Sequence, residues 1–198
     1  MIKDLYINFP IDLLEDDIQK AMNNILDYAI CRQAQNLRQG TEIDKINAAI
    51  RFFQMNGTNP QKVYENGEKI LSKYLGRKPI TASVKKTMIL EFMFAHKTDF
   101  EIDCFRVFCA IKSILGNKDM AYTNKNYIVS RAFKNSPQLQ VKYSIRYHID
   151  KVLQELETTW GLKRYSKYER GIYVSFKTEK LELEKISLLK KQRKCGKN

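Results

Sequence analysis

The segment Gly161-Leu-Lys-Arg-Tyr-Ser-Lys-Tyr-Glu-Arg-Gly-Ile-Tyr-Val-Ser-Phe176 is the most informative stretch of the chain. Its last six residues are rich in aromatic and β-branched types, and a short polar loop over 166–170 separates them from residues 162–165. Two strand-forming runs on either side of a polar loop are typical of a β-hairpin. The sequence therefore predicts a hairpin over residues 162–176.

Helical patterns precede this hairpin. Apolar residues at helical spacing predict a helix over 142–160, whose buried face is formed by Ile145, Ile149, Val152 and Leu156. Further towards the N-terminus the pattern predicts three more elements, namely a helix over 123–134 that Thr123 caps, a short strand at 120–122, and a helix over 100–115 that Asp99 caps. Gly161 and Gly116 follow two of these helices, as is common at helix ends.

The order of these elements over residues 100–176 resembles a winged helix-turn-helix domain. The resemblance rests on that order, on the spacing of Ile145, Ile149 and Leu156, and on the hairpin sequence. It implies that the helix over 142–160 is the recognition helix, that the hairpin is the wing, and that the strand at 120–122 joins the sheet of the wing. Residues 134–141 depart from the pattern, because they form a longer connection than the usual tight turn.

Residues 1–98 predict a helical region. We expect a short strand over 4–9, followed by helices over 13–37, from Thr41 through Phe53, over 60–75 and over 81–95. Asp12 and Glu15 are the expected capping pair of the first helix, and Asn59 before Pro60 is the expected start of the third. Gly67 is unfavourable within that third helix.

The expected fold is therefore mainly α and has three parts. Residues 1–98 form a helical region that dimerises, binds a partner or senses a ligand. Residues 99–177 form the winged helix-turn-helix, with three helices and a hairpin wing. Residues 178–198 form a basic C-terminal helix and tail.

The charge of the chain is unevenly distributed. The 198 residues have a formal net charge of +13, but residues 1–117 hold 16 basic and 14 acidic residues, whereas residues 118–198 hold 19 and 8. Strong asymmetry between two halves indicates contact with a nucleic acid or a membrane surface by one of them. We expect duplex DNA as the partner, since phosphate attraction is a common use of such a basic surface.

The expected recognition helix carries suitable side chains for DNA in its first turns. Arg146 is the best candidate for a paired contact with guanine, because its guanidinium matches the two acceptors of that base. Asp150 is the one acidic residue among the basic turns and counts against this interpretation. The candidate DNA-binding residues of this helix are Lys142, Tyr143, Ser144, Arg146, Tyr147 and Lys151.

The wing and the preceding helix add further candidates. A basic wing positions a protein by contacting phosphates, which carry no sequence information. Its candidate residues are Lys163, Arg164, Lys167 and Arg170. Asn124 and Lys125 lie where the helix over 123–134 begins, and a helix N-terminus is favourable for a phosphate. Solvation alone also explains such basic residues, and lysines on an edge hairpin discourage aggregation.

Two other functions remain open. A winged helix also serves as a protein–protein interaction module, because a fold does not fix its function. Alternatively the partner is RNA, whose unpaired bases stack on aromatic side chains. The tyrosines available for such stacking are Tyr143, Tyr147, Tyr165, Tyr168 and Tyr173.

Catalytic, metal and membrane functions are not indicated. The four cysteines and two histidines have no zinc-site spacing, and Cys104 and Cys109 lie in an apolar helical run that suits buried reduced thiols. No phosphate-loop, dinucleotide, zinc-protease or hydrolase motif is present. We expect no enzymatic activity, no cofactor, no small-molecule ligand and no membrane span. A cytoplasmic regulator of transcription or of mobile-element replication, acting as a homodimer, is the predicted function.

Overall fold

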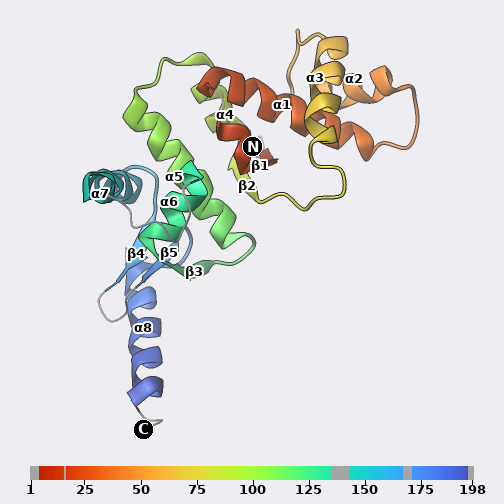
Figure 1. Cartoon of the computed structure of the whole chain (residues 1–198). Helices are drawn as coiled ribbons and strands as arrows, with labels where there is room; N and C mark the ends of the chain where they lie inside the picture. Colours follow the sequence, from red (N-terminus) through yellow and green to blue (C-terminus); the bar gives the residue numbers. More distant parts are fainter. Residues whose placement is uncertain (1–4, 16, 135–142, 167–170, 196–198) are drawn as a thin grey trace. The chain divides into compact units, whose positions relative to one another are not determined.

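The computed structural model describes residues 5–15, 17–134, 143–166 and 171–195. The chain divides into two compact units, residues 1–97 and residues 98–198. Helices make up most of the described residues and are accompanied by two small antiparallel sheets (Figure 1). The predicted mainly helical character is therefore confirmed.

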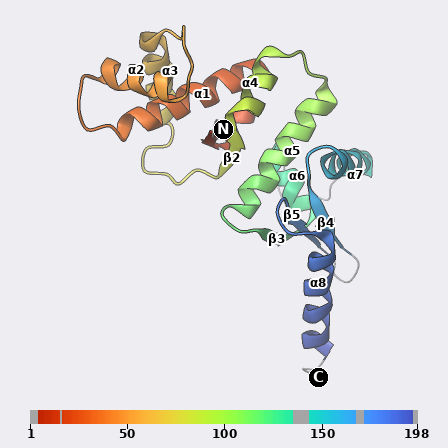
Figure 2. The same cartoon turned by 180° about the vertical axis from the view of Figure 1, so that it is seen from behind.

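In the first unit, helix α1 packs against most of the other elements. It contacts α2, α3, α4, the 3₁₀ helix η1 and strand β1. Figures 1 and 2 show α2 and α3 beside its C-terminal part. The elements of this unit are β1 (Tyr6–Pro10), η1 (Ile11–Glu15), α1 (Ile18–Gln35), α2 (Glu42–Phe52), α3 (Pro60–Ser72), β2 (Thr81–Lys85) and α4 (Lys86–Phe94).

The helix predicted over 81–95 is wrong in its first part. Residues 81–85 form β2, which pairs antiparallel with β1 so that Val84 lies opposite Ile7. Ala82 and Val84 are buried and Thr81 and Lys85 are exposed, which is the alternation of a strand that covers a core on one face. The helix begins only at Lys86. The sequence did not indicate this boundary, because an alternation over five residues is too short to be distinguished from a helical repeat.

In three helices the residue that caps the N-terminus differs from the one predicted from the sequence. Asp17 caps α1 by accepting from the backbone N–H groups of Gln19 and Lys20. The predicted capping residue, Asp12, lies in η1, where it accepts a hydrogen bond from the Tyr74 hydroxyl at 2.8 Å. In the second unit, Thr98 caps the helix where Asp99 was expected, and Asn124 does so where Thr123 was expected.

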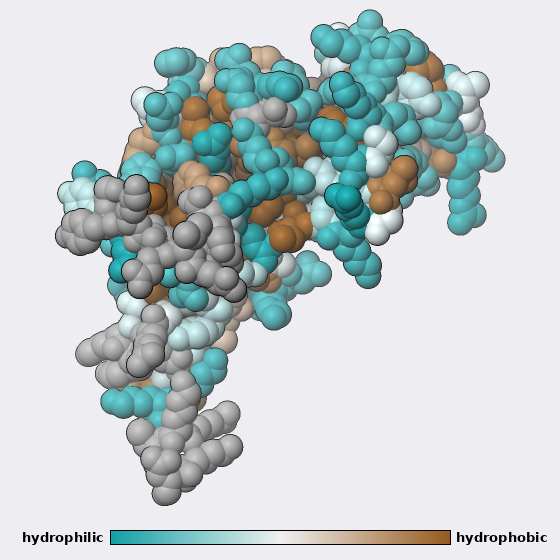
Figure 3. Space-filling model, in the orientation of Figure 1, coloured by the Kyte–Doolittle hydropathy of each residue, from teal (hydrophilic) through white to brown (hydrophobic). Residues whose placement is uncertain are grey.

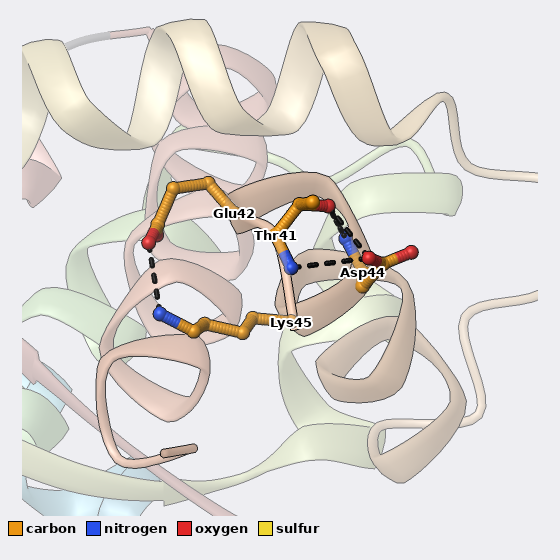
Figure 4. A network of polar contacts seen from close by, with 4 residues as sticks. All are labelled: Thr41, Glu42, Asp44 and Lys45. Atoms are coloured by element: carbon orange, nitrogen blue, oxygen red, sulfur yellow. Dashed lines mark hydrogen bonds and ion pairs between the residues drawn. The ribbon is translucent and has the colours of Figure 1, made fainter. Parts of the chain in front are cut away.

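Other helix starts agree with the sequence. Asn59 caps α3 with Pro60 in its first turn, as predicted. Thr41 begins a capping box with Asp44, because the Thr41 hydroxyl accepts from the Asp44 N–H and the Asp44 carboxylate accepts from the Thr41 N–H at 3.1 Å (Figure 4). The Thr41 hydroxyl also donates to the Asp44 carboxylate at 2.7 Å, and this bond together with that from the Thr41 N–H lowers the pKa of Asp44. Beside the box, Lys45 and Glu42 form an ion pair at 2.8 Å.

Gly67 permits a close approach of α3 to α1. A Cβ atom at this position would lie 2.0 Å from the Cys31 sulfur and 3.1 Å from the Asp27 carbonyl oxygen. One residue earlier, the Asn66 amide donates to the Asp27 carboxylate at 2.7 Å. Glycine within this helix is therefore a packing requirement, which outweighs its low helix propensity.

We expect Gly67→Ala to destabilise the first unit by about 1–3 kcal/mol, because the added methyl group overpacks the contact between α1 and α3. Urea unfolding followed by circular dichroism measures this change. The exposed neighbour Glu68 provides the matched control, since Glu68→Ala should change stability by less than about 0.5 kcal/mol. Adding Cys31→Ala should cost less in the Gly67→Ala chain than in the wild type; equal costs would contradict the contact.

The second unit is built around α5. Its elements are α5 (Asp99–Leu115), β3 (Met120–Thr123), α6 (Lys125–Phe133), α7 (Tyr143–Thr158), β4 (Lys163–Tyr165), β5 (Ile172–Ser175) and α8 (Lys180–Cys195). Helices α6 and α7 pack on α5, and α5 also contacts β3 and β5. The sheet has the order β3-β5-β4, so the predicted short strand does pair with the predicted hairpin.

The sheet and α8 share a small core. Tyr165 of β4 and Tyr173 of β5 lie opposite each other and pack against Leu183 of α8, with Met120 and Ile186 at the edge. The Tyr165 hydroxyl donates to the Glu184 carboxylate at 3.1 Å. This packing joins the C-terminal helix to the sheet, so α8 is an integral part of the second unit.

Candidate nucleic-acid interface

Helix α7 has one buried face and one exposed face. Ile149, Val152 and Leu156 have no exposed surface, and Leu153 beside them is also fully buried. The opposite face carries Tyr147 and Lys151, both exposed, whereas Arg146 is exposed at the edge of the buried face, in the turn before Ile149. The Lys151 ammonium lies 4.7 Å from the centre of the Tyr147 ring, close enough for a cation–π interaction. The structure thus brings together two of the six candidates predicted on this helix.

Several other predicted candidates fall outside the described part of the chain. Lys142 lies outside the described residues, as do Lys167 and Arg170 of the hairpin. Tyr143 and Ser144 lie in the first turn of α7, and their side chains are outside the described part.

Acidic side chains near this face are paired with basic ones. Asp150 forms an ion pair with Lys125 of α6 at 2.5 Å. The Asp103 carboxylate of α5 lies 2.9 Å from the His148 ring nitrogen and 3.5 Å from the Arg106 guanidinium. The negative charge of Asp150, which counts against a DNA contact in the sequence, is therefore offset by its neighbour.

This pairing also changes the interpretation of the start of α6. Lys125 is engaged with Asp150, and Asn124 uses its side-chain oxygen to accept from the Tyr127 N–H at 2.8 Å. Both residues lie at the helix N-terminus as predicted, but the side chain of each already has a partner within the protein.

Lys163 and Arg164 point to opposite faces of β4. Side chains alternate along a strand, so Lys163 shares the face of Tyr165, which packs against α8. Arg164 lies on the other face and forms an ion pair with Glu157 of α7 at 2.8 Å, with both side chains three-quarters buried. The structure therefore separates these two predicted wing residues and gives Arg164 a role in fastening the hairpin to α7.

The second strand of the hairpin begins at a crowded glycine. A Cβ atom on Gly171 would lie 2.4 Å from the Thr123 carbonyl oxygen, and the Gly171 N–H donates to the Tyr122 hydroxyl at 2.9 Å. Strand β3 therefore holds the hairpin in place by both backbone and side-chain contacts.

Sequence reasoning missed an aromatic and basic pair on α6. Arg131 and Tyr127 are one turn apart, and their side chains form a hydrogen bond and a cation–π contact with the guanidinium 5.0 Å from the ring centre. The spacing of four residues between an arginine and a tyrosine was the available signal.

The tyrosines proposed to stack on RNA bases have different environments. Tyr165 and Tyr173 are buried in the core beneath α8, so neither ring has a free face for a base. Tyr147 is 57% exposed and keeps this possibility. The other two tyrosines, Tyr143 and Tyr168, have no described side chain.

Cys31, Cys104 and Cys109 are buried free thiols. Burial raises the pKa of Cys31 and of Cys104 to about 12, and raises that of Cys109 well above its usual value. Within the described part of the chain, no group of three or more His, Cys, Asp or Glu residues has the arrangement of a metal site. None of the helices in that part is both long and apolar enough to cross a membrane.

Comparison with known proteins finds no matching family model, curated protein or solved structure.

We expect Arg164→Ala to destabilise the second unit by about 1–2 kcal/mol, because it leaves the partly buried Glu157 without its partner. Urea unfolding followed by the fluorescence of Trp160, the single tryptophan, which packs against Phe105 and Phe108, measures the change. Lys163→Ala on the opposite face should change stability by less than about 0.5 kcal/mol. Equal effects of the two substitutions would contradict the assignment of Arg164 to the packing of α7.

Proposed function

We propose that residues 98–176 form a winged helix that binds duplex DNA, with α7 in the major groove. The observation that carries this proposal is the pair of faces on α7. Ile149, Val152 and Leu156 anchor the helix, Lys151 lies on the accessible side, and Arg146 is exposed at the edge of the buried face near the start of the helix. A helix that reads base edges needs this division, because it must be held by its domain while its other face enters the groove.

The arrangement around α7 supports the same function. A short strand between the first two helices of the unit pairs with the β4–β5 hairpin, and the helices on either side of it pack on each other. This order and pairing is what the resemblance to a winged helix requires. The hairpin is fastened to α7 by the ion pair between Arg164 and Glu157, so helix and hairpin would contact one duplex as a unit.

The exposed residues of α7 have distinct roles in this proposal. Arg146 contacts the acceptor edge of a guanine with its guanidinium. Lys151 contacts a phosphate, and its position over the Tyr147 ring limits the freedom of its side chain before binding. Lys163 contacts the phosphate backbone from the hairpin. The function is therefore binding without catalysis, as in a regulator of transcription or of mobile-element replication.

We expect the wild-type protein to bind a random duplex of ~30 base pairs with an affinity that falls steeply as salt increases. Each phosphate contact contributes about −0.9 to the slope of log K against log salt, so Lys151→Ala should flatten the slope by about that amount. Arg146→Ala should weaken binding and reduce the preference among duplex sequences by about 1–3 kcal/mol. Fluorescence anisotropy at several salt concentrations measures both effects.

Lys69→Ala is the matched control, because it removes one exposed positive charge from α3 of the first unit. If it weakens binding as much as Lys151→Ala, the interaction depends on net charge and the site on α7 is wrong. Absence of binding at ~50 mM salt would overturn the proposal of DNA binding itself. Stronger competition by single-stranded RNA than by duplex DNA would instead favour RNA as the partner.

A further inference from the structure

One face of the β3-β5-β4 sheet carries a row of three tyrosines. Tyr122 of β3 lies directly opposite Tyr173 of β5, and Tyr173 lies directly opposite Tyr165 of β4. Residues that lie opposite each other on neighbouring strands point to the same face of a sheet. The ring centres of Tyr122 and Tyr173 are 5.1 Å apart. Because neighbouring strands are about 4.8 Å apart, the tyrosine row extends about 10 Å across the sheet.

Helix α8 covers the tyrosine row. Leu183 of the helix packs with Tyr165 and Tyr173, both of which are buried. The Lys190 ammonium lies 4.9 Å from the centre of the Tyr173 ring and 5.9 Å from that of the Tyr122 ring. Figures 1 and 2 show the helix running from the sheet out to the C-terminal end of the chain. While α8 is in place, only Tyr122 of the row is accessible, with 47% of its surface exposed.

Few apolar side chains hold this cover. Helices α7 and α8 are both 16 residues long. Among their described side chains, four aliphatic residues of α7 have no exposed surface, whereas Leu183 alone has this degree of burial in α8. Burial of apolar surface is the main force that holds a helix to its domain. Helix α8 is therefore attached more weakly than α7.

The packing of α8 also leaves two hydroxyl groups without a partner. The hydroxyls of Tyr173 and Ser187 are buried, and neither has a hydrogen-bond partner among the described residues. A buried hydroxyl in this condition has lost its hydrogen bonds to water and gained none in return, which is unfavourable. Separation of α8 from the sheet would let water bind both groups, so the cost of uncovering the row is reduced.

We propose that the tyrosine row is a binding site for the unpaired bases of a single-stranded nucleic acid, and that α8 is a displaceable cover of this site. Every base has a flat face that stacks on an aromatic ring, whatever the identity of the base. A row about 10 Å long has room for two or three such bases. None of the three tyrosines takes part in the proposed contact with duplex DNA, so the two functions are tested separately.

The cover makes the expected affinity depend on how firmly α8 is packed. A ligand that binds only the uncovered form has an apparent affinity reduced by the fraction of molecules in that form. Substitutions that weaken the packing of α8 should therefore strengthen the binding of a single strand, and substitutions that strengthen the packing should weaken it. Binding to a basic surface elsewhere on the protein would not follow this inverse relation.

Fluorescence anisotropy with a labelled oligo(dT) of ~12 nucleotides tests the proposal on the full-length protein. Leu183→Ser should raise the affinity about tenfold, because it removes the fully buried apolar side chain of the cover. Leu181→Ser is the matched control, since Leu181 is 65% exposed on the same helix and should leave the affinity unchanged. Binding of a ~30-base-pair duplex should be unaffected by Leu183→Ser, because α7 is not altered.

Substitutions of Tyr122 in the Leu183→Ser chain test whether an aromatic ring is the binding group. Tyr122→Phe and Tyr122→Leu both remove the hydroxyl that accepts from the Gly171 N–H, but only the second removes the ring. Tyr122→Phe should keep the tenfold gain in affinity. Tyr122→Leu should lower the affinity at least about fivefold, because one stacking contact is lost.

Two further measurements separate displacement of α8 from unfolding. Ser187→Ala removes a hydroxyl that has no partner, so it should strengthen the cover and lower the affinity of the otherwise wild-type chain about threefold. In hydrogen–deuterium exchange, the amides of α8 should exchange faster than those of α7, and oligo(dT) should make α8 exchange faster still. Trp160 fluorescence monitors whether the Leu183→Ser chain stays folded.

Four results would overturn the proposal. They are a folded Leu183→Ser chain that binds oligo(dT) no better than the wild type, a gain in affinity that survives Tyr122→Leu, a Ser187→Ala chain that binds as well as the wild type, and binding that leaves exchange in α8 unchanged. If Leu183→Ser unfolds the second unit, the last two results decide.

Discussion

The burial of Ile149, Val152 and Leu156 against α5 is the constraint on which the second unit depends. Because a helix has a fixed periodicity, anchoring these three positions also determines which residues face outward. Tyr147 and Lys151 are accessible as a consequence of that anchoring. The ion pair between Arg164 and Glu157 then extends the same packing to the hairpin. The exposure of Tyr147 and Lys151 is thus a consequence of how the apolar face of α7 is held.

The first unit depends on the approach of two helices. Gly67 lets α3 approach α1 at Cys31, and the hydrogen bonds of Asn66 to Asn24 and Asp27 satisfy polar groups beside this contact. Burial raises the pKa of Asp27, although the Asn66 hydrogen bond opposes that rise.

Exposed apolar side chains of this unit, such as Leu75 and Phe94, are distributed along the chain. Figure 3 shows apolar residues in several groups among hydrophilic ones on one face, and isolated ones are ordinary at a protein surface.

Periodicity in the sequence predicted the helices well, because the apolar residues of a long amphipathic pattern form the face that the helix buries. The apolar series through Ile149 and Leu156 is an example, and the strand at 120–122 followed from its short extended pattern. The prediction was wrong where the local structure of a segment depends on residues that are distant in the sequence. Residues 81–85 form a strand that pairs with β1, and Asp12 lies in η1, before the start of α1, where the Tyr74 hydroxyl, 62 residues away, donates to its carboxylate. No local pattern contains either partner.

The basic surface of the second unit is narrower than its composition indicates. Lys125 and Arg164 were both predicted to contact DNA, yet each is held by an acidic residue of α7. A count of basic residues includes such residues in full, whereas their field at a distance is largely cancelled by the acidic partner. Lys190 likewise lies over the Tyr173 ring, where it contributes to the packing of α8. Lys151 on the outer face of α7 and Lys163 on the hairpin are the described residues that the proposed binding of DNA uses, so that proposal depends on the position of the positive charge more than on its total.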